Sequence, residues 1–200
     1  MQLQTSGSST YLVSEDLIKP YISALQDTAV NFGLFEREEG SIIDYSNTAV
    51  FELFLFWLHQ GELPASMDFD NVPHEYPDEL RLAGEYMETL VHLWCFADRF
   101  GISGLQNAAM RMLLKYLTGR GTTYNLIRST LNEVKEDCVV WNAIFDVYAQ
   151  NLMNGFHFEC DELDMLGALP SLFRETLHRI ARYQVSVDTV PEVEVDAYMV

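Results

Sequence analysis

The chain has 200 residues, of which 48% are hydrophobic and 12% aromatic, a content that supplies a sizeable buried core and excludes a disordered chain. Its 30 acidic residues outnumber its 12 basic residues, which gives a formal net charge of −18. A field of this sign repels phosphate groups and anionic lipid head groups, so we expect neither direct nucleic-acid binding nor membrane binding.

The cysteine content and the N-terminus bear on the compartment. The three cysteines, Cys95, Cys138 and Cys160, lie far apart in the sequence, so no disulfide framework is predicted. An intracellular location, cytoplasmic or nuclear, fits this content best. Residues 1–10 are polar and lack the apolar segment of a signal peptide, and we expect them to be flexible. The longest apolar run, residues 49–58, has about half of the ~20 residues that a membrane helix needs.

The first elements expected along the chain are short. Residues 11–13 and 41–45 have the length and composition of short strands. Between residues 47 and 58, hydrophobic side chains recur at the spacing of one helical face, which predicts a helix. Gly61 stands where a left-handed C-terminal cap would end that helix. Residues 64–79 then combine three prolines with acidic residues, and this composition predicts an acidic loop.

The middle of the chain predicts two amphipathic helices joined by a tight turn. In residues 81–100 hydrophobic side chains recur at helical spacing, and Gly101 ends the segment. Ser103 and Gln106 have the S-x-x-Q spacing of a capping box at the start of a second helix, residues 103–118. Three tryptophans each lie in an apolar helical stretch and are expected in the core: Trp57, Trp94 and Trp141.

The composition changes at a glycine-containing stretch, residues 119–123, after which further helices are predicted. They cover residues 124–131, 138–153 and 170–183. Residues 185–200 alternate valine with acidic residues around a proline, and we expect a frayed acidic tail there. The predicted organisation is a flexible N-terminus at 1–10, a domain at 11–118, a helical extension at 119–184 and an acidic tail at 185–200.

Three stretches of the sequence resemble BTB/POZ domains. Residues 41–61 join a short strand to a helix that ends in Trp57-Leu58-His59-Gln60-Gly61, which is similar to the family's W-L-Y-x-G turn. Residues 90–113 (LVHLWCFADRFGISGLQNAAMRML) resemble the family's next helix pair, in the form seen especially in fungal members. Residues 17–22 look like a shortened L-L-x-x-x-S-P-Y-F junction. The resemblance implies a mainly α (α+β) fold: a helical cluster with a small short-stranded sheet, followed by a C-terminal helical extension.

The resemblance also implies a non-enzymatic protein–protein interaction module. BTB domains typically self-associate, and many bind the N-terminal region of a cullin scaffold to bring substrates to a ubiquitin ligase. In cullin-binding members a hydrophobic-x-Glu element follows the second core helix, and Leu34-Phe35-Glu36 occupies a comparable place. The expected partners are proteins, either a cullin scaffold or a second copy, and the expected partner-binding residues are Leu34, Phe35, Glu36 and Glu52.

The chain departs from the family pattern at its front end. Only a remnant of the usual first hairpin is expected, at residues 11–13, and Ser14 stands where the family usually has His. His59 replaces the Tyr of the W-L-Y-x-G turn. Since the first strand supports homodimer exchange in many animal members, its loss leaves dimerisation open. The alternative to an adaptor is therefore a structural or vestigial BTB-like domain with no adaptor role.

Residues capable of metal binding or catalysis form no recognisable site in the sequence. His92 and Cys95 share a helical face at i, i+3, but no second pair lies at zinc spacing. The acids of residues 68–79 lack the spacing of a calcium loop. Two acidic residues directly before Cys138 disfavour its thiolate, and motifs of nucleophilic or nucleotide chemistry are missing. We therefore predict no enzyme activity, no metal and no cofactor.

Overall fold

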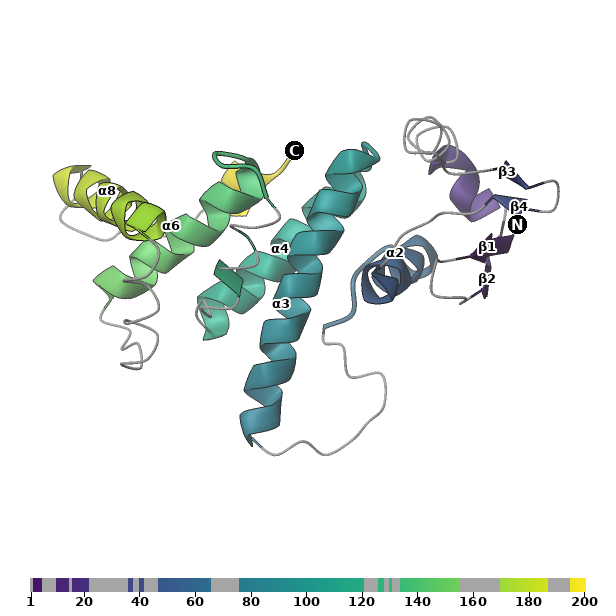
Figure 1. The fold of residues 1–200 in the computed structure, drawn as a ribbon, viewed down its shortest axis with the longest axis horizontal. Coiled ribbons are helices and arrows are strands. Elements are labelled where there is room, and N and C mark those ends of the chain that lie inside the picture. The colour runs from purple at the N-terminus through teal and green to yellow at the C-terminus, as the bar shows by residue number, and fades with distance from the viewer. Residues whose placement is uncertain are drawn as a thin grey trace.

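The computed structural model describes residues 2–4, 10–14, 16–21, 36–37, 40–41, 47–65, 76–120, 126–127, 130, 134–154, 170–186 and 195–200. Their dominant structure is helical, which confirms the predicted mainly α class. The long helices are α2 (Thr48–Gln60), α3 (Tyr76–Arg99), α4 (Ser103–Arg120), α6 (Val139–Met153) and α8 (Pro170–Ser186). Figure 1 shows them in chain order across the molecule, from α2 beside the strands to α6 and α8 at the other end.

The strands differ from the expected small sheet. β1 (Gln2–Gln4) pairs antiparallel with β2 (Thr10–Leu12), and β3 (Glu36–Arg37) pairs antiparallel with β4 (Gly40–Ser41). These are two separate two-stranded pairs, so the prediction of one small sheet is not confirmed. The physical reason is length, because pairs of two or three residues are too short to build a sheet with its own hydrophobic face. Most of the strand expected at 41–45 lies outside the described residues.

Helix α2 has the boundaries that the local sequence predicts. Its N-cap, Asn47, accepts a hydrogen bond on its side-chain oxygen from the backbone N–H of Val50, at 3.3 Å. At the other end Gly61 has the left-handed φ of 78°, and its N–H donates to the carbonyl of Trp57 at 2.8 Å. One face of the helix is buried: Val50, Phe51, Leu53, Phe54 and Leu55.

Helix α3 begins earlier than predicted, and α4 ends later. α3 starts at Tyr76, so the last residues of the predicted loop 64–79 are helical. Pro77 is tolerated because the N–H groups of the first turn have no intrahelical partner, and the acids that follow favour a helix N-terminus. α4 continues to Arg120 and includes Gly119, since one glycine costs a helix only about 1 kcal/mol.

The turn between α3 and α4 ends one helix and starts the next. Gly101 has a φ of 65°, and the N–H of Ile102 donates to the carbonyl of Ala97 at 2.8 Å, the hydrogen bond of a Schellman cap. Because α4 begins at Ser103, the predicted capping box does not form. Gln106 instead donates its side-chain amide to the Asp98 carboxylate at 3.0 Å, which ties the two helices together.

Two glycine substitutions test the effect of backbone conformation at positions where an added side chain makes no clash. A Cβ added at Gly101 or at Gly84 meets no described atom within 4 Å. Gly101→Ala should nevertheless lower the free energy of unfolding by about 1 kcal/mol, since L residues are strained at positive φ. Gly84→Ala, inside α3, should raise it by about 0.5–1 kcal/mol because alanine is the better helix former. Urea denaturation measures both, and equal signs would contradict the explanation.

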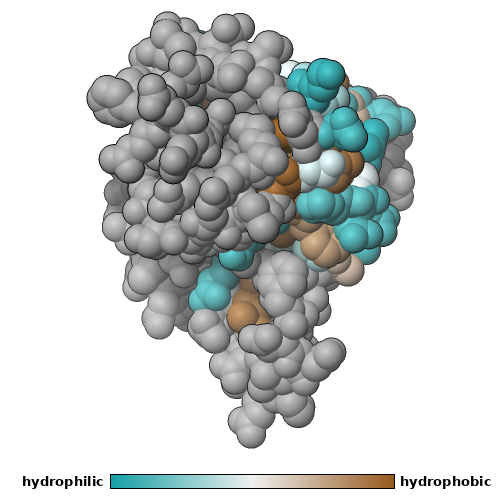
Figure 2. All heavy atoms as spheres, turned by 90° about the vertical axis from the view of Figure 1, so that its right-hand side faces the viewer, coloured by the Kyte–Doolittle hydropathy of each residue, from teal (hydrophilic) through white to brown (hydrophobic). Residues whose placement is uncertain are grey.

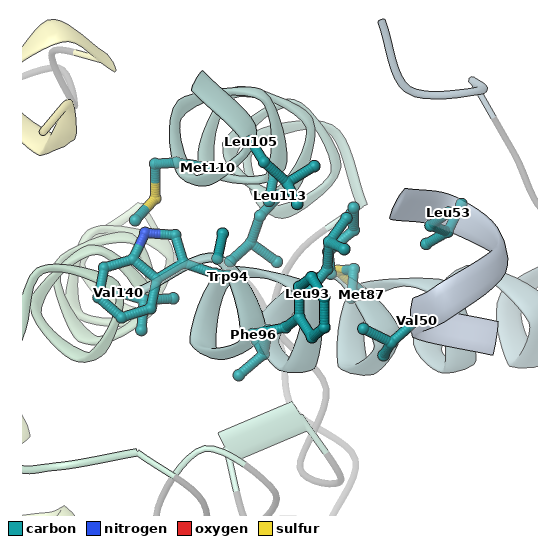
Figure 3. Packing of buried hydrophobic residues seen from close by; sticks show 14 of the residues in the cluster. Val50, Leu53, Met87, Leu93, Trp94, Phe96, Leu105, Met110, Leu113 and Val140 are labelled. Carbon is teal, nitrogen blue, oxygen red and sulfur yellow. The ribbon is translucent and has the colours of Figure 1, made fainter. Parts of the chain in front are cut away.

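One hydrophobic cluster runs through α2, α3, α4 and α6. Trp94 of α3, 5% exposed, lies beside Met110 of α4 and Val140 of α6 (Figure 3). Trp141 is likewise buried, as predicted, whereas Trp57 is only half-buried and lies against Tyr21 and Gly104. Residues on both sides of the predicted boundary at 118 therefore share one core.

Candidate functional site

The structure places the four predicted partner-binding residues only in part. Leu34 and Phe35 lie outside the described residues, and Glu36 belongs to β3. Glu52 lies on α2 and is exposed, while its neighbours Phe51 and Leu53 are buried. Figure 2 views the end of the molecule that carries α2 and the strands, and its described surface mixes hydrophobic and hydrophilic residues. Whether these four residues form one surface therefore stays a prediction.

The residues considered for metal binding lie on helices or outside the described part. His92 and Cys95 are both half-buried on α3. Among the described residues, no group of three or more His, Cys, Asp or Glu side chains is arranged to hold a metal ion. The described helices also include none that is long and apolar enough to span a bilayer.

The Cys138 thiol is half-buried at the N-cap of α6. Burial is the main reason that its pKa is raised, and the negative charges of Asp98 and Asp137 raise it further. The backbone N–H groups of Trp141 and Val140 act in the opposite direction. The direction agrees with the sequence prediction, although the leading cause is desolvation rather than the adjacent acids. The thiol is therefore poorly suited to act as a nucleophile.

The most developed polar cluster lies between α6 and α8, around Arg179. Arg179 is 4% exposed, and its guanidinium forms ion pairs with Asp146 of α6 and with Glu175 one turn earlier on α8. It also donates to Asn142, to the backbone carbonyl at 3.1 Å and to the side-chain oxygen at 2.6 Å. A buried arginine with this many acceptors fixes α8 against α6 in one orientation.

Aromatic rings cover the same guanidinium. Its central carbon lies 5.2 Å from the ring centroid of Trp141 and 5.8 Å from that of Phe145. The two rings are themselves stacked at a tilt, with centroids 4.3 Å apart. Such contacts with a desolvated cation are worth up to about 2 kcal/mol. Arg179 therefore joins the polar cluster to the hydrophobic core.

The Asp146 carboxylate accepts hydrogen bonds from two tyrosine hydroxyls as well as from Arg179. The Tyr183 hydroxyl donates to Oδ1 at 2.8 Å, and the Tyr198 hydroxyl donates to Oδ2 at 2.7 Å. Burial raises the pKa of Tyr183 to about 12, and the hydrogen bond to Asp146 contributes. Burial and the same carboxylate also raise the pKa of Tyr198. Both hydroxyls therefore remain protonated donors at neutral pH.

Tyr198 belongs to a segment that sequence reasoning expected to be frayed. Residues 195–198 form the 3-10 helix η1, and Tyr198 and Met199 pack against the hydrophobic cluster. Next to them, Asn107 of α4 donates to the backbone carbonyl of Val200 and accepts from its backbone N–H, both at 2.8 Å. The prediction of a frayed tail is therefore wrong for residues 195–200, because these contacts hold the segment on α4 and α6.

Only one local signal pointed towards this cluster. Glu175 and Arg179 stand at the i, i+4 spacing of a helical ion pair, but the same spacing is common on solvated helix faces. The other partners of Arg179 and Asp146 are 33 to 52 residues away along the chain. Within the described residues both oxygens of the Asp146 carboxylate accept hydrogen bonds, and Glu175 pairs with Arg179, so the cluster links α6, α8 and η1.

Comparisons of the chain with protein-family models, curated proteins and solved structures find no match. The resemblance to BTB/POZ domains therefore stays a prediction, and function has to be argued from the geometry of this chain.

Proposed function

We propose that the chain is a protein–protein interaction scaffold of the BTB/POZ type that binds a cullin N-terminal domain through α2 and the residues before it. The helix succession supports the proposal. In the stretch that resembles the family, Leu93 and Leu105 are buried on either side of the Gly101 turn, while Asp98 is exposed. This is the arrangement that a helix–turn–helix unit of that kind requires.

The observation that carries the proposal is the two-sided character of α2. One side is buried in the core. The other side presents Glu52, Phe56 and His59 at i, i+4 and i+7, with Phe56 half-buried and the other two exposed. A polar row around one aromatic side chain is typical of interfaces that form between separately folded proteins.

The test is calorimetric titration of the purified chain with the N-terminal domain of a BTB-binding cullin. We expect a dissociation constant of about a micromolar or tighter. Glu52→Lys on α2, and Phe35→Ala and Glu36→Lys before it, should each weaken binding about tenfold or more, which corresponds to about 1.4 kcal/mol. These substitutions should leave the unfolding transition unchanged where the side chain is exposed, as for Glu52.

Glu136→Lys is the matched control. It makes the same change of charge at an exposed position shortly before α6 in the sequence. Figure 1 shows α6 and α2 on opposite sides of α3 and α4. The control should retain the affinity of the unchanged chain, apart from a small long-range effect of charge. Equal losses for Glu52→Lys and Glu136→Lys would assign the effect to net charge and remove α2 as the contact. Absence of binding at about 100 μM would reject the adaptor function.

A further inference from the structure

The segment of residues 195–200 is bound to the rest of the chain as a peptide is bound to a receptor. Its contacts come from two different helices, Asp146 on α6 and Asn107 on α4. Figure 1 places this end of the chain beside the upper part of α6. The described residues of the segment are all half-buried or exposed, with Val195 at 40% and Val200 at 51%.

The two contacts recognise different features of the segment. Asp146 accepts the hydroxyl of Tyr198, so this contact selects a tyrosine. The Asn107 carboxamide pairs with both the N–H and the carbonyl of Val200, so this contact recognises the backbone two residues further on. Met199 lies between them and packs partly buried against the core. The surface thus recognises a tyrosine, a hydrophobic residue and an accessible peptide group at fixed spacing.

The segment is also poorly anchored compared with the helices. It includes no fully buried side chain, and segments with few buried contacts open at low free energy. Because the segment is linked to its binding surface, its effective concentration there is of the order of millimolar. In an isolated chain the segment therefore occupies its own surface in preference to that of a second copy. Every copy of the chain carries both the segment and the surface that recognises it.

We propose that the surface formed by Asn107 of α4 and Asp146 of α6 is a peptide-binding site, which the chain's own residues 195–200 occupy and which accepts the same segment from a second copy. Exchange of an identical element between copies is a low-cost route to self-association, because the contacts made are those of the single chain. The proposal depends on these contacts and not on cullin binding, so either can fail while the other stands.

The experiment pairs two full-length variants that complement each other. Asn107→Ala weakens the acceptor surface and leaves the segment intact. Tyr198→Ala weakens the segment and leaves the acceptor surface intact. A fluorescently labelled Asn107→Ala chain is titrated with unlabelled Tyr198→Ala chain, and anisotropy measures binding. The control is a labelled chain that carries both substitutions, which has the same other surfaces but lacks the tyrosine.

We expect the labelled Asn107→Ala chain to bind the Tyr198→Ala chain at least tenfold more tightly than the doubly substituted chain does. Equal affinities would overturn the proposal, because any association would then use another surface. Asn107 and Tyr198 are both half-buried, and thermal unfolding monitored by circular dichroism checks that each variant folds.

A second probe keeps the test decisive if a variant is unstable. Tyr198→Phe removes only the hydroxyl that Asp146 accepts. An acetylated, labelled peptide with the sequence of residues 195–200 should bind the Tyr198→Phe chain at least tenfold more tightly than it binds a Tyr198→Phe, Asn107→Ala chain. The unchanged chain, whose site is occupied, should bind the peptide more weakly than Tyr198→Phe. Binding that is insensitive to Asn107 would overturn the proposal.

Discussion

Replacing Arg179 by methionine should lower the free energy of unfolding by about 3 kcal/mol, the lower end of the range for breaking a buried ion pair. Methionine keeps an unbranched apolar stem, although it is shorter than arginine, and it leaves the Asp146 carboxylate without its cation. The Asp146 side chain is 18% exposed, so residual hydration limits the loss. The variant also loses the stacking of the guanidinium on Trp141 and Phe145. Urea denaturation followed by circular dichroism measures the effect.

Arg182→Met on the same helix is the matched control. Arg182 is exposed, and substitutions at such positions usually change stability by less than about 0.5 kcal/mol. Combining Arg179→Met with Asp146→Asn should cost less than the sum of the two single changes, because the second removes the charge that the first leaves unpaired. A loss below about 1 kcal/mol for Arg179→Met alone would contradict a stabilising role of the cluster.

Trp94→Ala should lower the free energy of unfolding by about 3–5 kcal/mol, because it deletes a buried aromatic side chain where α3, α4 and α6 meet. Trp57→Ala makes the same chemical change at a half-buried position, and should cost about half as much. Urea denaturation of the two variants measures both losses. Because the residue type is the same, the difference between the losses reports the effect of burial. Equal losses would contradict the position of Trp94 at the junction of the helices.

The indole nitrogen of Trp94 provides a finer test. It is buried and has no hydrogen-bond partner among the described residues. Trp94→Phe deletes this unsatisfied group together with part of the ring, so the gain from the first offsets part of the loss from the second. We expect Trp94→Phe to cost well under half of the Trp94→Ala effect. A larger loss would indicate that the nitrogen has a partner.

Helices could be predicted where the signal was local. The periodic hydrophobic residues of α2, its Asn47 cap and its Gly61 terminus all lie within a few residues of one another, and so does the Gly101 turn. Prolines were the main source of error, because Pro77 was taken to exclude a helix although the first turn accepts it. The single small sheet was not confirmed among the described residues, since strands of two or three residues depend on their pairing more than on their own sequence.

The candidate partner site was predicted from a resemblance rather than from a physical pattern. Glu52 could be placed on the exposed side of its helix because the period of α2 assigns Phe51 and Leu55 to the core. Leu34 and Phe35 lie outside the described residues, so their relation to Glu52 stays a prediction. A three-residue sequence pattern does not specify where its side chains lie relative to a distant residue such as Glu52. Only tertiary contacts between the two segments could have specified that position.

The amino-acid sequence was sufficient for the helical class, the order of the helices and the burial of Trp94 and Trp141, because period, caps and hydrophobicity act over a few residues. Tertiary structure alone decided the position of Arg179 and the docking of residues 195–200. Tyr198 meets Asp146 across 52 residues and Val200 meets Asn107 across 93. The composition of an acidic, valine-rich tail predicts a solvated segment. Only the packing of α4 and α6 places the Asp146 carboxylate and the Asn107 amide beside it.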